Sequence, residues 1–281
     1  MTSSPTPGSP RADIGVIGGS GFYEFLEDAE RVRVQTPFGE PSDEVVVGSL
    51  AGRQVAFIAR HGQGHRFPPH KVNYRANLWA LRAVGVRQVL APCAVGSLKP
   101  ELGPGSIVVP DQVVDRTWGR EHTVYDAIGP VVHAGFADPY CPRGRETVTR
   151  VARDAGKDVT DTGTLVVVNG PRFSSRAESQ WHQQAGWSVV GMTAMPEAAL
   201  ARELAMCFTT IALVTDHDAG VEGGEAVTHE EVLRVFARNV DDLKTVLAST
   251  IEAMPPAEPD ETATCACRRA LDGITLPIEL P

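Results

Sequence analysis

Short runs of apolar and β-branched residues recur along the chain, and each is bounded by glycine, proline or polar residues. Runs of this length and composition favour buried β-strands. The predicted strands cover residues 14–17, 44–48, 54–59, 88–95, 107–110, 163–169, 188–192 and 207–215.

Helical patterns alternate with these runs. Residues 72–84 place Leu78, Leu81 and their apolar neighbours mostly at helical spacing, and residues 196–205 begin with a proline, which suits the first turn of a helix. Further helices are expected at 145–155 and 177–185. Thr228 and Glu231 have the spacing of a capping box, which predicts a long helix from residue 228 to 246 or beyond. This alternation indicates a sheet with crossover helices.

The two ends of the chain depart from this pattern. Residues 1–11 are rich in Ser, Pro and Thr, and we expect them to form a disordered tail. Residues 254–261 (MPPAEPDE) end the long helix, after which a last short helix and the apolar residues 274–280 are expected to pack back on the body. No internal repeat or linker interrupts residues 12–281, which we interpret as a single α/β domain.

Composition narrows the classes of function. The 281 residues include 26 Lys and Arg against 35 Asp and Glu, which gives a formal net charge of -9. This excess of negative charge argues against binding to nucleic acid or to an anionic membrane surface. No apolar run approaches the roughly 18 residues needed to span a bilayer, and the N-terminus lacks the pattern of a signal peptide. We therefore predict a cytoplasmic protein with no nucleic-acid or membrane partner.

The cysteines are few and odd in number. Cys93, Cys141, Cys207, Cys265 and Cys267 do not suit a secreted disulfide scaffold, so reduced thiols are expected. The Cys265 and Cys267 pair could bind a metal or form a strained disulfide. Because no His or Cys lies near the pair in the sequence, we interpret both as ordinary thiols and predict no metal site.

The first predicted strand runs into a glycine-rich turn, residues 18–21, which contains Ser20. Such a turn could hold a phosphate against backbone amides, or it could be purely structural. The turn has no Walker lysine, and the third glycine of a dinucleotide fingerprint would fall at Glu24. An NAD-dependent dehydrogenase is therefore disfavoured.

Polar residues also follow other predicted strands. Arg60 and His61 could bind an oxyanion through a bidentate fork and an imidazole donor, or they could lie in a solvated turn. The small residues 94–97 would allow a ligand close to the backbone, or would simply pack. Asp216 and Asp218 end an apolar run, where a buried carboxyl pair could supply a general acid or merely form a turn. Phe173 lies in a turn that could stack a flat ring.

Taken in order, these segments resemble the phosphorylases that cleave purine nucleosides, most closely the methylthioadenosine phosphorylase branch. The resemblance runs from residue 14 to about 248 and is carried by residues 17–21 (IGGSG), 36–43 (TPFGEPSD), 59–62 (ARHG), 71–77 (KVNYRAN), 96–98 (GSL), 170–178 (GPRFSSRAE) and 192–197 (MTAMPE). It implies a three-layer α/β domain with a central mixed β-sheet flanked by helices. It also implies a homotrimer or homohexamer whose active sites borrow residues from a neighbouring subunit.

The resemblance assigns roles to particular positions. It places phosphate at Ser20, Arg60, His61, Ala94 and Thr193, with Cys93 where a threonine is usual. It places the nucleoside against Phe173, Met192, Asp216, His217 and Asp218, and it implies that His133 reaches the 5′ pocket of the neighbouring subunit.

The implied reaction is the phosphorolysis of S-methyl-5′-thioadenosine to adenine and 5-methylthioribose 1-phosphate. The purine leaves as an electron-rich group, and Asp216 with a raised pKa would protonate it at N7. Inorganic phosphate is a co-substrate, and no metal or organic cofactor is expected. A non-catalytic purine- or phosphate-binding protein is the alternative of a different class.

The residues expected to select the substrate do not all favour the same nucleoside. Asp216, Asp218 and Ser174 favour a 6-aminopurine, because a carboxylate would repel the O6 atom of a 6-oxopurine. His229 stands where the methylthioadenosine branch has a small apolar residue, and it suits a 5′-hydroxyl instead. Adenosine, inosine and methylthioinosine are therefore alternative substrates.

Overall fold

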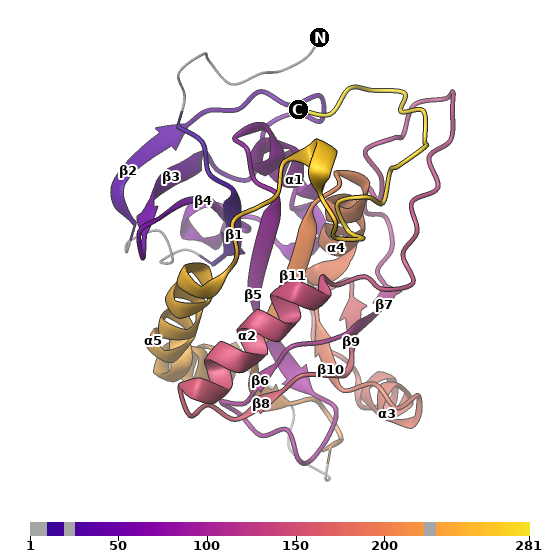
Figure 1. Cartoon of the computed structure of the whole chain (residues 1–281). Coiled ribbons are helices and arrows are strands. Elements are labelled where there is room, and N and C mark those ends of the chain that lie inside the picture. The colour runs from indigo at the N-terminus through magenta and orange to yellow at the C-terminus, as the bar shows by residue number, and fades with distance from the viewer. Residues whose placement is uncertain (1–9, 20–25, 222–228) are drawn as a thin grey trace.

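A mixed eleven-stranded sheet forms the centre of the molecule (Figure 1). The computed structural model describes residues 10–19, 26–221 and 229–281, apart from several side chains in the first turns of the last helix. The sheet order is β2-β3-β4-β1-β5-β10-β9-β7, with β11 beside β5 and β6, and β8 beside β6. The strands are β1 Ile14–Gly18, β2 Glu27–Val32, β3 Val45–Leu50, β4 Arg53–Ala59, β5 Gln88–Ser97, β6 Ile107–Val108, β7 Gln112–Arg116, β8 Val159–Thr160, β9 Thr164–Val168, β10 Val189–Gly191 and β11 Cys207–His217.

Alternate residues of the central strands face two separate hydrophobic cores. Val55 and Phe57 of β4 belong to one core, whereas Ala56 and Ile58 belong to the other. The first core also contains residues of α2 Pro142–Asp154 and α5 His229–Ala253. The second contains residues of α1 Tyr74–Ala83 and α4 Ala194–Glu203. Because successive side chains of a strand point to opposite faces, the helices cover both faces. The predicted three-layer α/β arrangement with a mixed sheet is confirmed.

The remaining helix, α3 Arg176–Gln184, lies at one end of the sheet (Figure 1). Ser175 and Glu178 form a capping box at its start. This cap fixes the start of α3, directly after the segment that contains Phe173 and Ser174.

Three strands were not predicted from the sequence. β2 (EDAERV) is largely exposed and is paired only with β3 in the sheet order, and β7 lies at the opposite end of that order, beside β9. Edge strands of this kind carry little hydrophobic signal. β8 has only two residues.

The prediction of a last short helix is wrong. Residues 260–262 form a single 3-10 turn, and residues 266–273 form further turns. The apolar end does return to the body, because Leu276, Ile278 and Leu280 pack against the core of α1 and α4. Residues 1–9 of the predicted tail, and Thr228 of the predicted capping box, lie outside the described residues.

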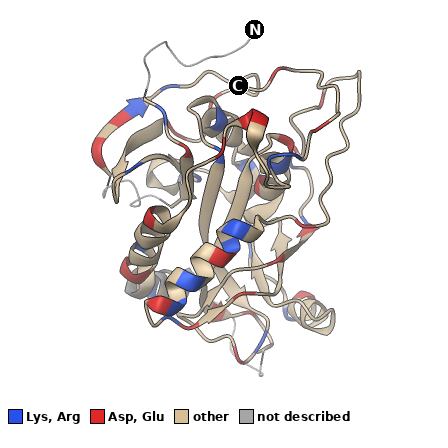
Figure 2. Cartoon of the chain, in the orientation of Figure 1, with Lys and Arg blue, Asp and Glu red and all other residues tan. Residues whose placement is uncertain are grey.

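Residues of both charge signs are interspersed along the chain, and α2 carries both (Figure 2). Within the described ranges, no helix combines the length and apolar character that crossing a bilayer requires.

One expectation about the cysteines is wrong. Cys265 and Cys267 do have cysteine partners in space, since they form a buried cluster with Cys141 and Cys207. Cys265 is 58 residues from Cys207 and 124 residues from Cys141 along the chain. The sequence alone therefore does not show that these residues are neighbours.

Candidate active site

Several of the predicted phosphate-binding residues follow the ends of neighbouring strands. β1 and β4 are parallel, and Gly18 pairs with Ala59, so Gly19 and Arg60 follow the two strands at the same level. The backbone N–H of Arg60 donates to the carbonyl of Gly18 at 3.0 Å. β5 lies on the other side of β1 and is parallel to it. The carboxyl ends of parallel strands are the usual ligand-binding edge of an open α/β sheet.

Arg60 is buried and its guanidinium is largely occupied. Nε and Nη2 donate to the two carboxylate oxygens of Glu197 at 2.6 and 3.1 Å. Nη1 and Nη2 also donate to the carbonyls of Pro92 and Ile17. Among the described residues, four of the five N–H donors of the guanidinium are therefore taken. The expectation of a free bidentate fork is wrong, because Glu197 accepts that fork.

Glu197 keeps Arg60 charged. Burial alone would lower the pKa of Arg60, but the Glu197 carboxylate raises it above its ordinary value. The guanidinium also connects the end of β4 to β1 and to the middle of β5 through its contacts with Ile17 and Pro92. Arg60 thus contributes a fixed positive charge and one remaining donor on Nη1.

His61 is neutral in this arrangement. Its Nδ1 lies 2.8 Å from the carbonyl oxygen of Phe67, and since a carbonyl only accepts, Nδ1 carries the proton. Burial, reinforced by the nearby Arg60 charge, lowers the pKa of His61 to about 4. Nε2 consequently presents a lone pair. The expected imidazole donor becomes an acceptor, which can accept a hydrogen bond from a protonated phosphate oxygen.

β10 brings Met192 and Thr193 close to the residues of β5 that belong to the candidate site. It runs antiparallel to β5, with Val190 opposite Gly96, and so the residues after β10 approach Ala94 and Cys93. Thr193 is buried at the start of α4, and its hydroxyl makes no capping hydrogen bond there. Burial raises the pKa of Cys93 to about 12, so that this residue is a neutral thiol.

Asp216 lies near the end of β11, beside β5. It is paired with Gly96, and a bulge between Val214 and Asp216 shifts the register there. A Cβ atom on Gly96 would lie 3.1 Å from Asp216 Oδ2 and 3.4 Å from Asp218 Cβ. Thr215 donates its hydroxyl to Asp216 Oδ1 at 2.7 Å. The absence of a side chain at Gly96 therefore makes room for the carboxyl pair.

Asp218 is the more buried of the two acids. Burial raises its pKa, although hydrogen bonds from the hydroxyls of Ser174 and Ser179 oppose the shift. Its Oδ2 atom is buried and has no hydrogen-bond partner within the described part of the chain. An acid of this kind has an oxygen left to contact a ligand.

The other predicted site residues differ in how far they are buried. Phe173 is half-buried beside Ser174, and Met192 lies against Gly170, whose Cβ would come 2.6 Å from its sulfur. His217 is half-buried and pairs with Ser97. His133 is exposed on an irregular segment. Ser20 and the side chain of His229 lie outside the described residues.

Two buried residues of the site were not predicted. Glu197 lies within the motif of residues 192–197, where an acid among apolar residues was the available signal. Arg120 donates to the carbonyls of Met195 and Asn169 and to the Tyr74 hydroxyl. It thereby joins α1, α4 and the end of β9, and no sequence pattern marks it.

Comparisons with known proteins agree with this arrangement. The model of the Phosphorylase superfamily matches residues 13–252. A purine nucleoside phosphorylase of Streptomyces coelicolor is 58% identical over 96% of this chain and 98% of its own. An S-methyl-5′-thioadenosine phosphorylase of Mycolicibacterium smegmatis is 52% identical over 95% of this chain and 99% of its own.

Solved structures extend the agreement to three dimensions. A methylthioadenosine phosphorylase from an antarctic soil metagenomic library superposes with a TM-score of 0.85 at 39% identity, covering 94% of this chain and 92% of the other. The methylthioadenosine phosphorylase of Schistosoma mansoni in complex with adenine gives 0.82 at 37% identity, covering 86% and 92%. The chain belongs to the phosphorylase superfamily.

Proposed function

We propose that this chain is a pentosyltransferase that cleaves S-methyl-5′-thioadenosine with inorganic phosphate, releasing adenine and 5-methylthioribose 1-phosphate. The observation that carries the proposal is the carboxyl pair beside Gly96, in which Asp218 has a raised pKa and a buried oxygen without a partner in the described chain. Relatives named S-methyl-5′-thioadenosine phosphorylase, at 41 to 52% identity, support the choice of substrate.

The carboxyl pair matches adenine in its hydrogen bonds. Adenine presents an acceptor at N7 and donors at its 6-amino group, whereas a 6-oxopurine presents acceptors at both N7 and O6. A pair of neighbouring acids that shares one proton supplies one donor and one acceptor. Asp216 and Asp218 therefore suit the 6-aminopurine. A proton delivered to N7 neutralises the leaving purine as the bond between C1′ and N9 breaks.

Phosphate is held at the strand ends by groups that are already fixed. Arg60 supplies a positive charge whose position is set by Glu197, and the lone pair of His61 Nε2 accepts a hydrogen bond from a protonated oxygen of phosphate. Thr193 and the backbone N–H of Ala94 provide neutral donors. Fixed groups of this kind stabilise the ribosyl cation and position the nucleophile without reorganisation during the reaction.

Base release from a panel of nucleosides tests the proposal. Methylthioadenosine, adenosine, methylthioinosine and inosine are each incubated with and without phosphate, and the free base is measured by chromatography. We expect release only with phosphate, and a kcat/KM for 6-aminopurine nucleosides at least roughly 100-fold above that for 6-oxopurine nucleosides. Preference for inosine would contradict the role given to the acids. No release from any nucleoside would favour a non-catalytic binding protein.

A purine nucleoside phosphorylase that accepts a 5′-hydroxyl is the second candidate. It is favoured by the Streptomyces coelicolor relative at 58% identity and by the histidine at position 229, the first residue of α5. The ratio of kcat/KM for methylthioadenosine over adenosine separates the two candidates. If His229 binds a 5′-hydroxyl, then His229→Val raises this ratio, and an unchanged ratio removes His229 from substrate recognition.

We also propose that the active enzyme is a homotrimer or homohexamer. The segment around His133 exposes Trp118, Ile128 and Val131, with Ile128 fully exposed at 109%. Several large apolar side chains exposed along one stretch of chain favour an interface between subunits. Light scattering should give three or six times the 30.1 kDa of one chain. Val131→Asp should weaken the assembly and raise KM for the nucleoside, and a monomeric, fully active protein would refute this proposal.

A further inference from the structure

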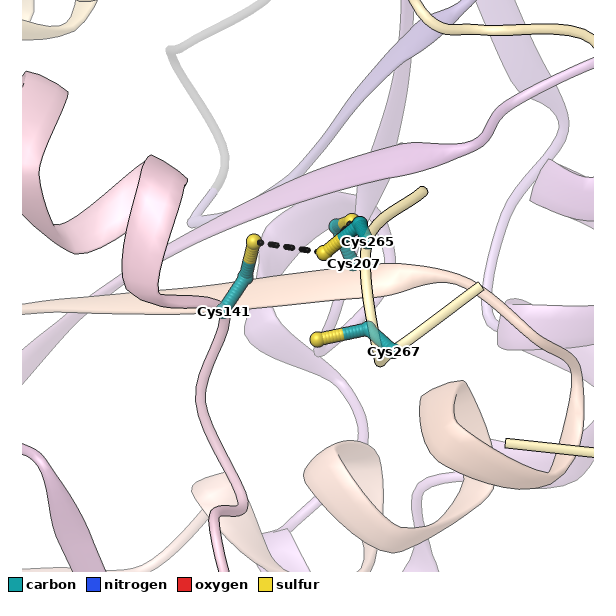
Figure 3. A group of neighbouring side chains, drawn as sticks. All are labelled: Cys141, Cys207, Cys265 and Cys267. Carbon is teal, nitrogen blue, oxygen red and sulfur yellow. Dashed lines mark hydrogen bonds between the residues drawn. The ribbon is translucent and has the colours of Figure 1, made fainter. Parts of the chain in front are cut away.

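Four of the five cysteines meet at one point in the structure (Figure 3). Cys141 precedes the first residue of α2, Cys207 begins β11, and Cys265 and Cys267 come from the C-terminal segment. All four are buried, and their sulfur atoms lie within 4.8 Å of one another. All are free thiols. Three separate parts of the fold therefore contribute to one compact group of sulfur atoms.

The spacing of the sulfur atoms fits a metal ion. Cys265 Sγ lies 3.7 Å from Cys141 Sγ and 3.6 Å from Cys207 Sγ. A tetrahedral zinc ion with bonds of about 2.3 Å to four thiolates separates the sulfur atoms by about 3.8 Å. A disulfide would require sulfur atoms only about 2 Å apart. We propose that Cys141, Cys207, Cys265 and Cys267 bind one Zn²⁺ ion in a closed tetrathiolate site.

The chemistry of the ligands selects the ion. Thiolates are soft ligands, and a tetrahedral set of four of them suits zinc, whereas Mg²⁺ and Ca²⁺ require oxygen ligands. Four protein ligands leave no open position for water or substrate, which is typical of a structural zinc site. The site is also remote from the proposed chemistry, because Cys207 and Asp216 are nine residues apart along β11, or roughly 30 Å. The ion would hold the fold together.

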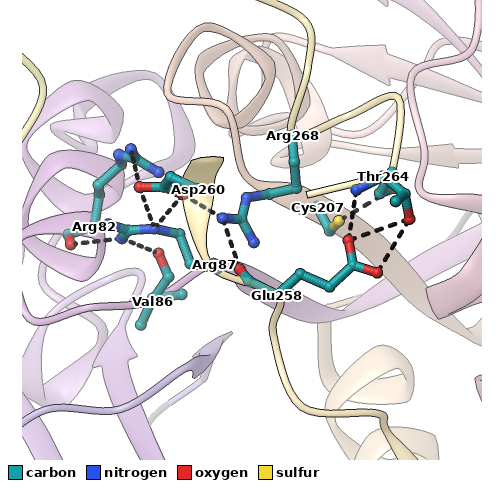
Figure 4. Close-up of polar contacts among 9 residues, drawn as sticks. Arg82, Val86, Arg87, Cys207, Glu258, Asp260, Thr264 and Arg268 are labelled. Atoms are coloured by element: carbon teal, nitrogen blue, oxygen red, sulfur yellow. Dashed lines mark hydrogen bonds and ion pairs between the residues drawn. The ribbon is translucent and has the colours of Figure 1, made fainter. Parts of the chain in front are cut away.

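The C-terminal segment is held in place by ion pairs close to the cysteines (Figure 4). Asp260 accepts hydrogen bonds from Arg82, Arg87 and Arg268. Glu258 accepts from Arg143, near Cys141, and from Thr264, the neighbour of Cys265. These contacts bring Cys265 to Cys141 before any metal binds. Pre-positioned ligands need less ordering when the ion arrives.

An arginine contacts the cluster. Zinc with four thiolates carries two net negative charges, which a buried site must offset. Arg202 Nη2 lies 3.7 Å from Cys267 Sγ and can donate to a thiolate there. Arg268, which follows Cys267 in the sequence, is buried but pairs with Asp260, so Arg202 is the arginine that contacts the sulfur atoms among the described residues. Donors of this kind around the ligands are a general feature of metal sites.

The ion would attach the C-terminal segment to the body of the enzyme. Cys265 and Cys267 lie beyond residues 13–252, which the superfamily model matches. Cys141 and Cys207 lie within that range, and they are next to each other because the backbone N–H of Cys141 donates to the carbonyl of Phe208. The site therefore joins the segment after α5 to the start of α2 and the start of β11.

Metal content of the full-length protein tests the proposal. The protein is produced with added zinc, purified under reducing conditions without chelator, and measured by mass spectrometry of the elements. We expect one zinc per chain. Cys265→Ser should lose this zinc, whereas the matched variant Cys93→Ser, which alters the one cysteine outside the cluster, should retain it. Removal of zinc from the wild type should lower the melting temperature by roughly 5–10 °C.

A second measurement decides the question if Cys265→Ser does not fold. Reduced wild-type protein is titrated with Co²⁺, which gives intense visible absorption when it is bound tetrahedrally by thiolates, and Zn²⁺ should then displace it at one equivalent. Folded wild-type protein that holds neither metal would overturn the proposal. So would iron in place of zinc, or an intact mass lower by two hydrogens for each disulfide formed within the cluster. All of these results are independent of which nucleoside the enzyme cleaves.

Discussion

Arg60 and Glu197 form a buried two-point ion pair between the end of β4 and α4, 137 residues apart in the sequence. Their side chains are only 4% and 1% exposed. A buried charge is tolerated when it is paired and most of its remaining donors are satisfied, and here the carbonyls of Ile17 and Pro92 accept from two more donors of Arg60. The pair thus fixes the positive charge of the proposed phosphate site.

Replacing Glu197 by glutamine should destabilise the fold and weaken phosphate binding. Arg60 would keep its charge in a buried position without a counterion, which costs about 3–5 kcal/mol of unfolding free energy. Glu40→Gln is a matched control, because Glu40 lies the same 2.6 Å from Arg33 but both side chains are at least 75% exposed. The control should change stability by less than about 1 kcal/mol. Chemical denaturation measures both variants, and equal effects would mean that burial does not decide the strength of this pair.

Gly96→Ala should lower kcat while leaving most of the stability. The new Cβ would lie 3.1 Å from Asp216 Oδ2 and 3.3 Å from Val190 Cγ1, so that the carboxyl group must shift. A shift of a positioned catalytic group costs roughly 100-fold in rate. Gly103→Ala is the control, since nothing lies within 4 Å of its Cβ and kcat should not change. Steady-state kinetics on both variants check this, and a fully active Gly96→Ala enzyme would remove Asp216 from the site.

The sequence predicted the centre of the sheet because its strands are buried. The runs that became β1, β4, β5 and β11 are apolar, and polar or small residues at their ends were identified as candidate site residues. β2 could not be predicted, because its residues (EDAERV) are mostly polar and their strand conformation depends on pairing with β3. The pattern of apolar residues along a segment indicates whether the segment is buried. An exposed edge strand lacks that pattern, and its conformation depends on the strand with which it pairs.

The same limit applied to the site. Arg60 and His61 were identified as candidates, but the groups that set their protonation, Glu197 and the carbonyl of Phe67, belong to other parts of the chain. The cysteine pair at 265 and 267 was noticed, while its partners at 141 and 207 could be found only in the fold. Residue types indicate chemistry, and tertiary contacts decide which atoms are available for it.

The two acids should respond differently to removal of their charge. Asp216→Asn should lower kcat on methylthioadenosine by about 100- to 10,000-fold, since general acid catalysis is lost, while KM for phosphate stays near its original value. Asp218→Asn should instead shift the ratio of kcat/KM toward 6-oxopurine nucleosides, because an amide can donate to O6. The nucleoside panel measures both effects. If Asp218→Asn abolished turnover and Asp216→Asn did not, the acid would be Asp218, as its raised pKa would also allow.

The buried imidazole of His61 predicts how stability depends on pH. Its pKa is lowered from 6.5 to about 4 in the folded protein. Above pH 6.5 the ring is neutral in both states, whereas below it the unfolded chain binds a proton that the folded protein refuses until about pH 4. The free energy of unfolding should therefore fall as the pH drops between these values, by roughly 3 kcal/mol from this residue. In His61→Asn the amide can still donate to Phe67 but does not titrate, so its stability should fall less over the same interval. Denaturation of both proteins at several pH values isolates the difference, and parallel curves would show that His61 titrates alike in the folded and unfolded states.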